Sequence, residues 1–115
     1  MFSKRTRRVA LIGPLGETRV SVHTAGYPLA PDRMLPPADV VLVVSDKDSA
    51  MLFRYTAHGE FCGDTPHRSV VDAMQQADTE YGEALLGWVD VPPDVADAHA
   101  FAIKYAAENL NERDE

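Results

Sequence analysis

The middle of the chain, from residue 51 to residue 91, constrains the fold most, because patterns for a hairpin, a helix and a further strand follow one another closely there. Met51, Phe53 and Tyr55 alternate with other side chains at a period of two, which is typical of a half-buried strand. Gly59 offers a residue that readily adopts a positive backbone angle, and an extended pattern resumes directly after it. We therefore expect an antiparallel hairpin with Gly59 in its turn.

A helix is predicted directly after this hairpin. Ser69 stands before an apolar residue and Asp72 follows three residues on, a spacing that can satisfy free amides in a first helical turn. Gly82 stands where such a helix would end. Residues 84–91 favour another strand, which a pair of prolines would end. Spacings of three and four place one group of apolar side chains on a single stripe, namely Val70, Ala73, Met74, Ala77 and Tyr81.

The flanking segments add strands, a loop and a second helix. Residues 8–12 and 18–22 have strand character, and residues 40–44 form an unbroken apolar run that is typical of a strand at the middle of a sheet. Residues 25–38 are rich in proline and are expected to form a loop. An alanine-rich helix is predicted over residues 94–110, with acids at its start.

The predicted fold class is α+β. We expect a two-layer sandwich, in which an antiparallel or mixed sheet of about five to six strands carries both helices on one face. A chain of 115 residues is long enough for a single hydrophobic core. The expected domain organisation is a basic amino-terminal tail over residues 1–8, one α+β domain over residues 9–110 and a frayed carboxyl-terminal tail over residues 111–115.

Charge is distributed unevenly along the chain. Residues 1–38 hold six Lys or Arg against two acids, whereas residues 39–115 hold five against sixteen, and the formal net charge is −7. An acidic body repels phosphate and so disfavours nucleic-acid binding through the main surface. The exception is the basic group Lys4, Arg5, Arg7 and Arg8, which is either a solvated tail or a contact for RNA or an acidic partner.

The sequence favours a cytoplasmic protein without a membrane span. The lone Cys62 has no second cysteine with which to form an internal disulfide, which fits a reducing compartment. The apolar run over residues 9–12 is too short for a signal core or a membrane-spanning segment. Gly13 and Gly16 follow a strand, but their spacing fits neither nucleotide-binding fingerprint, so no cofactor is expected.

Cys62, Asp64 and His67 form the candidate cluster for chemistry. A thiolate, a carboxylate and an imidazole could ligate zinc or form a nucleophile with its base, although no second ligand pair repeats the pattern. On an extended strand Cys62 and Asp64 would share one side, and Pro66 is expected to redirect the chain before His67. The favoured interpretation is a structural loop in which Asp64 or Thr65 hydrogen-bonds the turn.

The remaining histidines and the aromatic residues have structural interpretations. We expect His58 to be solvated in the hairpin turn and His99 to be partly buried and hydrogen-bonded beside the apolar side of the last helix. The aromatic residues Phe53, Tyr55, Phe61, Tyr81 and Trp88 are expected in the core.

One segment resembles a known group of proteins. The residues that carry the resemblance are Phe61, Gly63, Asp64, Thr65 and His67, followed by Ala73, Gln76, Ala77, Glu80, Tyr81 and Gly82. It is similar to a set of short uncharacterised bacterial proteins that share an aromatic residue, Gly-Asp-Thr, an aromatic residue and His, then a helix ending in Glu-Tyr-Gly. Pro66 stands where that pattern has a tryptophan. The resemblance covers part of the chain and implies a bacterial origin and a domain shape, without a known activity.

Our leading hypothesis is a small acidic non-enzymatic protein that binds another protein, of the inhibitor, immunity or adaptor type, because electrostatic steering speeds capture of a basic target. One alternative is a small enzyme or metal-binding protein that uses Cys62, Asp64 and His67. Another is nucleic-acid binding through the basic amino terminus. An open sheet edge at residues 40–44 or at the first hairpin would also allow two copies to pair across a two-fold axis.

Overall fold

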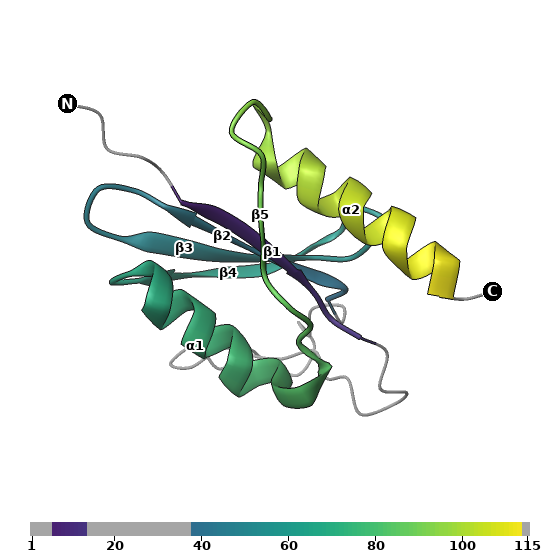
Figure 1. Ribbon diagram of the computed structural model, residues 1–115. Helices are drawn as coiled ribbons and strands as arrows, with labels where there is room; N and C mark the ends of the chain where they lie inside the picture. The colour runs from purple at the N-terminus through teal and green to yellow at the C-terminus, as the bar shows by residue number, and fades with distance from the viewer. Residues whose placement is uncertain (1–5, 14–37, 114–115) are drawn as a thin grey trace.

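The computed structural model describes residues 6–13 and 38–113 of the chain (Figure 1). The predicted strand over residues 18–22 and nearly all of the predicted proline-rich loop lie outside the described residues. Lys4 and Arg5 of the predicted basic contact also lie outside them. The elements are β1 (Arg7–Leu11), β2 (Val40–Ser45), β3 (Ala50–Tyr55), β4 (Phe61–His67), α1 (Val70–Tyr81), the 3-10 turn η3 (Gly82–Ala84), β5 (Val89–Asp90) and α2 (Ala98–Arg113).

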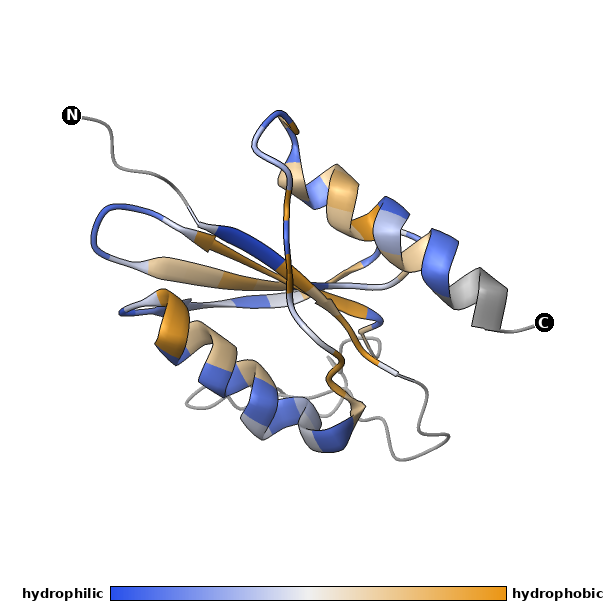
Figure 2. Ribbon diagram, viewed as in Figure 1, coloured by the Kyte–Doolittle hydropathy of each residue, from blue (hydrophilic) through white to orange (hydrophobic). Residues whose placement is uncertain are grey.

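The strands form one antiparallel sheet, so the predicted α+β class is confirmed. Within the described residues it has five strands, in the order β4-β3-β2-β1-β5. The unbroken apolar run becomes β2 in the middle of the sheet, and Val40, Val41, Leu42 and Val43 are all 0% exposed. Figure 2 shows that the turn between β2 and β3 is hydrophilic, whereas the middle of the sheet is mainly hydrophobic.

The helices lie on opposite faces of the sheet, so the prediction of both helices on one face is wrong (Figure 1). Side chains alternate between the two faces of a strand. Val41 and Val43 of β2 belong to the core under α1, whereas Val40 and Leu42 belong to the core under α2. A central strand with apolar side chains on both sides needs a cover on each face, and the fold therefore has three layers.

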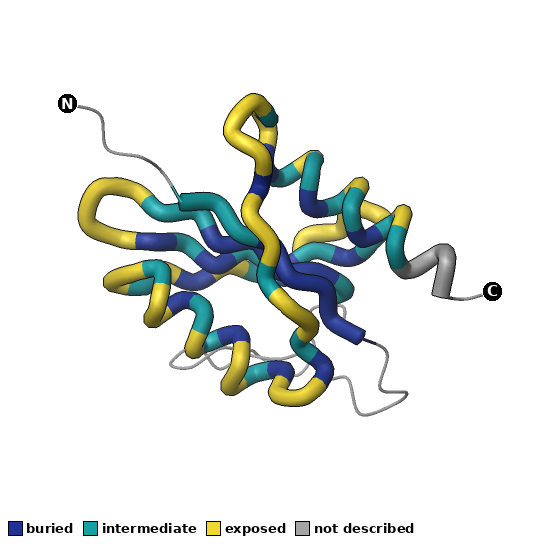
Figure 3. Tube along the Cα trace, in the orientation of Figure 1, coloured by how far each residue is buried: buried dark blue, intermediate teal, exposed yellow. Residues whose placement is uncertain are grey.

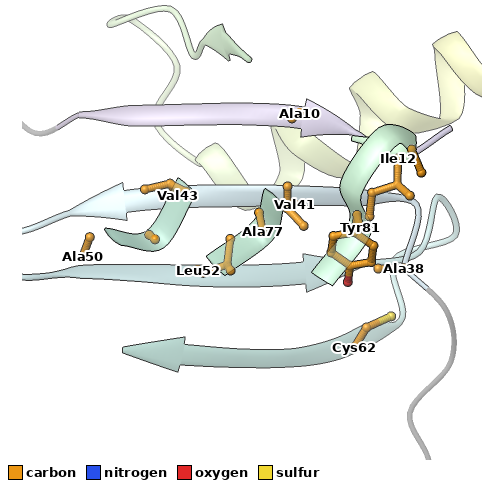
Figure 4. Packing of buried hydrophobic residues seen from close by; sticks show 12 residues of the cluster. Ala10, Ile12, Ala38, Val41, Val43, Ala50, Leu52, Cys62, Ala77 and Tyr81 are labelled. Carbon is orange, nitrogen blue, oxygen red and sulfur yellow. The ribbon is translucent and has the colours of Figure 1, made fainter. Parts of the chain in front are cut away.

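Helix α1 forms as predicted. The Ser69 hydroxyl accepts a hydrogen bond from the amide of Asp72 at 3.1 Å, and Gly82 ends the helix with a φ of 54°. The predicted stripe faces the sheet, and Figure 4 shows Ala77 against Val41 and Leu52 of the strands. In Figure 3 buried and exposed positions alternate along α1, as expected of a helix with one side on a sheet.

Helix α2 begins at Ala98, four residues later than predicted, and continues to Arg113 instead of ending at residue 110. The Asp97 carboxylate accepts hydrogen bonds from the amides of His99 and Ala100, at 3.0 and 3.1 Å. The preceding segment is instead a turn in which the Val95 amide donates to the Pro92 carbonyl at 3.0 Å. Asp97 therefore fills the capping role that the sequence assigned to Asp94.

At the β1–β5 end of the sheet, β5 is shorter than the sequence suggested, and β1 begins one residue earlier. Of the strand predicted over residues 84–91, the two residues of β5 pair with β1, and Leu85 makes an isolated bridge to Ile12. Strand β1 begins at Arg7, so Arg7 and Arg8 belong to the sheet and not to a tail. The predicted tail over residues 1–8 therefore ends earlier than expected.

Candidate functional site

A β-bulge in β4 decides where the candidate site residues point. In the β3–β4 register Phe53 pairs with Asp64 and Tyr55 pairs with Phe61, so Arg54 faces the two residues between them. One of these is Gly63, whose φ of 107° is a conformation that glycine adopts without the steric cost of a side chain. Residues directly opposite each other share a sheet face, so the bulge reverses which side chains of β4 point to which helix.

The bulge places Asp64 on the opposite face of the sheet from Cys62 and His67, the other two residues of the predicted cluster. Cys62 is buried in the core under α1, where its thiol donates to the Glu60 carbonyl at 3.5 Å. Asp64 lies opposite Phe53 on the other face and is exposed, so the expectation that it shares a side with Cys62 is wrong. Among the described residues, no three His, Cys, Asp or Glu side chains are grouped so that they could hold a metal ion.

Pro66 does not redirect the chain, and the predicted structural loop is a strand. Strand β4 continues through Pro66, which lies opposite Met51, to His67. Among the described residues β4 is the outermost strand on its side of the sheet, where a missing amide donor need not break the ladder, and proline is therefore tolerated there. His67 consequently lies on the α1 face, two residues beyond Thr65.

A buried ion pair lies on that face. The Arg54 side chain is 1% exposed and the Glu80 side chain 3% exposed. Arg54 Nε donates to Glu80 Oε1 at 2.8 Å, and Arg54 Nη2 donates to Glu80 Oε2 at 2.7 Å. Gln76, one turn earlier on α1, also donates to Glu80 Oε2, at 2.7 Å. The pair therefore joins β3 to the last turn of α1 with the geometry of a two-bond guanidinium–carboxylate contact.

The network continues from Arg54 to β4. Arg54 Nη2 also donates to Thr65 Oγ1 at 3.2 Å, and Thr65 Oγ1 is hydrogen-bonded to His67 Nε2 at 2.7 Å. Burial lowers the pKa of His67, the positive charge of Arg54 lowers it further, and the carboxylates of Asp72 and Glu80 oppose this shift. Within the described residues no buried side-chain nitrogen or oxygen is left without a partner. The network therefore connects α1, β3 and β4 through satisfied polar groups.

Thr65 and His67 have the contact distance of a hydroxyl nucleophile and its base. Thr65, however, is 4% exposed, and its oxygen already accepts from the Arg54 guanidinium. A nucleophile must reach a substrate and keep a lone pair for attack, and this hydroxyl is covered and engaged. The arrangement is suited to holding elements together.

The opposite face of β3 and β4 carries a partly exposed group of aromatic and acidic side chains. Phe61 is 50% exposed and its ring lies 6.0 Å from that of Tyr55, in a T-shaped arrangement. The Tyr55 hydroxyl is hydrogen-bonded to His99 Nδ1 at 2.7 Å, which confirms a hydrogen-bonded, partly buried His99. We call this group the Tyr55 patch and define it as Phe53, Tyr55, Phe61, Asp64, Asp97 and His99.

Two carboxylates, those of Asp64 and Asp97, act on the Tyr55 hydroxyl. Burial raises the pKa of the Tyr55 phenol, and the negative charges of Asp64 and Asp97 raise it further. Both acids therefore lie close enough to act on the Tyr55 hydroxyl, although one comes from β4 and the other from the start of α2. The sequence placed Phe61 in the core, and that prediction is wrong because α2 packs over β1 and β2 and leaves Phe61 half exposed.

The described part of the predicted basic contact is already engaged within the protein. Arg7 donates to the carbonyls of Val95 and Pro92, at 2.7 and 2.9 Å. Arg8 Nε forms an ion pair with Asp90 at 3.2 Å, and its Nη1 contacts the sulfur of Met74 at 3.5 Å. An open depression of about 610 Å³ adjoins both arginines. Each of the two guanidinium groups thus already has two contacts within the protein.

Comparison with known proteins gives no relative on which to base a function. The chain matches no protein-family model, no curated protein and no solved structure. A search of the described helices finds none that is long and apolar enough to cross a membrane.

Proposed function

We propose that the chain is a small non-enzymatic protein that binds another protein through the Tyr55 patch. The observation that carries this proposal is the exposure of Phe61 on β4, the outermost strand on its side of the sheet in the described part of the chain. Phe61 is 50% exposed and its ring lies in a T-shaped arrangement with that of Tyr55, so it presents an apolar surface to solvent. Aromatic side chains held in this way are enriched among the residues that dominate protein–protein interfaces.

Charge favours a basic partner. The negative charges of Asp64 and Asp97 act on Tyr55, Glu60 precedes Phe61, and the whole chain carries a formal net charge of −7. A surface of this sign attracts a positively charged protein and speeds its capture, and added salt weakens the attraction. Catalysis has less support than binding. The polar groups of the network on the α1 face are already satisfied, and Cys62, Asp64 and His67 do not form one cluster.

The proposed setting is the bacterial cytoplasm. The resemblance of residues 61–82 to short bacterial proteins supports the origin, and the buried thiol of Cys62 supports a reducing compartment. Nucleic-acid binding through the amino terminus remains a second hypothesis, but Arg7 and Arg8 would have to leave their present partners to neutralise phosphates.

The proposal can be tested by selecting a displayed random-peptide library on the immobilised protein at low salt. We expect enrichment of peptides rich in Lys or Arg, with retention that falls as salt rises from about 0.01 M to about 1 M. Phe61→Ser should abolish retention of the selected peptides, and Asp64→Asn with Asp97→Asn should weaken it. Asparagine is chosen at residue 97 because it caps a helix as well as aspartate does.

Val71→Ser is the matched control, since Val71 is 61% exposed on α1, on the opposite side of the sheet from the patch. It should retain the selected peptides as the unaltered protein does. Equal retention by Phe61→Ser, or an absence of enrichment in a correctly folded protein, would overturn the proposal.

A further inference from the structure

We infer that the partner docks an amphipathic helix beside α2, on the same face of the sheet, with one Lys or Arg in the middle of the apolar side of that helix. This inference rests on the proposed function and specifies the form and the chemistry of the partner segment. The docking surface, which we call the β3–β4 face, consists of the side chains of β3 and β4 that share a face with the Tyr55 patch, namely Met51, Phe53, Tyr55, Phe61, Asp64 and Pro66.

Burial on this side of the sheet decreases from the middle strands to β4. Val9 of β1 and Leu42 of β2 are 0% exposed in the core under α2. Phe53 and Tyr55 of β3 are only partly buried at the margin of that core, and Phe61 of β4 is 50% exposed. Among the described residues, α2 therefore covers this side of β1 and β2 and leaves the β3–β4 face open.

The β3–β4 face has the dimensions of one helix. Neighbouring strands lie about 4.8 Å apart, so two of them span about 10 Å, which is close to the diameter of a helix. Strand β3 has six residues and is therefore about 20 Å long, a length that a helix of about 13 residues matches. On the other side of the same strands α1 lies over Leu52 and Cys62, which are 0% and 3% exposed. A second helix beside α2 would complete the layer in the same way.

One charge in the middle of the β3–β4 face selects the occupant. Asp64 is exposed opposite Phe53, with an apolar cross-strand pair on either side of it. A docked helix would cover this carboxylate, and covering a charge is costly unless the helix supplies a cation. The α1 side shows the same solution with the signs reversed, since Arg54 of β3 is paired with Glu80 of the helix. A Lys or Arg in the middle of the apolar side therefore distinguishes the partner helix from other amphipathic helices.

A second copy of this chain is a poorer occupant. Two β3–β4 faces in contact would bring the Asp64 carboxylates of both copies into one interface, and each copy carries a formal net charge of −7. Like charges held together in an interface oppose association. The occupant is therefore a helix of a separate, basic polypeptide.

The test uses a blocked peptide of about 14 residues built on Ala and Gln, with Leu at helical spacing along one side and a single Lys in the middle of that side. One version carries Glu in place of Lys, and another has the same composition with its Leu residues at a period of two. Fluorescence anisotropy at low salt measures binding, and circular dichroism measures the helix formed on mixing. We expect the helical Lys peptide to bind at least about tenfold more tightly than either version and to gain helix when bound.

Two substitutions that change the net charge equally separate the local effect of Asp64 from the charge of the whole protein. Asp64→Lys should remove the preference for the Lys peptide and shift it toward the Glu version, because it reverses the charge in the middle of the β3–β4 face. Asp78→Lys is the matched control, since Asp78 is exposed on α1, on the opposite side of the sheet. It should leave the preference for the Lys peptide in place.

Equal binding of the period-two peptide would show that the segment does not dock as a helix, and a preference for Lys that survives Asp64→Lys would show that Asp64 does not select it. A dimer of the unaltered protein in sedimentation velocity that Phe61→Ser dissociates would show that a second copy covers the face. Each of these results, or no binding of the helical Lys peptide, overturns the inference. If library peptides are still retained through Phe61, the proposed function stands without it. If Phe61→Ser retains them all, the proposed function itself fails.

Discussion

The guanidinium of Arg54 and the carboxylate of Glu80 face each other in two hydrogen bonds, at 2.8 and 2.7 Å, although 26 residues separate them in the sequence. Both side chains are almost fully withdrawn from solvent, at 1% and 3% exposure. Removing a charge from water is costly, so each group depends on the other for its place in the core. The pair thus makes the docking of α1 on β3 sensitive to a single substitution.

Arg54→Met is expected to lower the free energy of unfolding by about 3–5 kcal/mol, because it leaves the Glu80 carboxylate buried without its counter-charge. The double variant Arg54→Met with Glu80→Leu should recover much of this loss, since neither charge then remains. Denaturant unfolding followed by circular dichroism measures both values.

The exposed pair of Lys104 and Glu108, 4.0 Å apart, provides the control for this cycle. Replacing both residues with uncharged ones should change the free energy of unfolding by less than about 1 kcal/mol. A single Arg54 variant as stable as the unaltered protein would contradict the buried pairing.

Gly63→Ala is expected to destabilise the protein by about 1–3 kcal/mol, because alanine must adopt the positive φ of 107° at the bulge. Gly87→Ala is the matched control, since a Cβ there would meet no atom within 4 Å and its φ is not positive. Thermal unfolding of the two variants compares them directly. Equal stability of the two would mean that the bulge tolerates a side chain.

The local elements could be predicted from the sequence because their signals are local. The alternation in β3, the turn at Gly59 and the Ser69 cap each depend on residues within a few positions of one another, and the structure confirms all three. The central place of β2 also followed, since an unbroken apolar run requires cover on both faces. The same argument requires a cover on each face of the sheet, and the prediction of a two-layer sandwich with both helices on one face was inconsistent with it.

The candidate site could not be predicted because it depends on register. The shift of one residue at Gly63 places Asp64 in the Tyr55 patch and Thr65 in the Arg54 network. A glycine within a strand pattern does not by itself predict a bulge. Only the tertiary fold brings Arg54 to Glu80 or His99 to Tyr55. A charged residue in a predicted half-buried strand was nevertheless a signal, since Arg54 needed either solvent or a buried partner.

His67 should make the stability of the protein depend on pH. Burial and the charge of Arg54 lower its pKa, so the folded state binds a proton less readily than the unfolded chain. The contribution of His67 to the free energy of unfolding is complete above the ordinary histidine pKa of about 6.5. It is lost as the pH falls below that value toward the pKa in the folded state. The free energy of unfolding of the unaltered protein, relative to that of His67→Gln, should therefore decrease as the pH falls through this window.

Denaturant unfolding at a series of pH values measures this difference, and His58→Gln is the control because His58 is exposed in the β3–β4 turn. A nuclear magnetic resonance titration should give His67 a pKa below the usual range for histidine. A difference between the unaltered protein and His67→Gln that is constant with pH would refute the prediction.

Asp97→Ala should lower the free energy of unfolding by about 0.5–2 kcal/mol, because the carboxylate accepts hydrogen bonds from the amides of both His99 and Ala100. Asp94→Ala should change it by less than about 0.5 kcal/mol, since Asp94 is exposed in the turn before α2. The two residues have the same chemistry and lie three positions apart, so chemical denaturation of the pair measures where the helix begins. A larger loss for Asp94→Ala than for Asp97→Ala would place the start of α2 three residues earlier, directly after the cap that the sequence pattern first suggested.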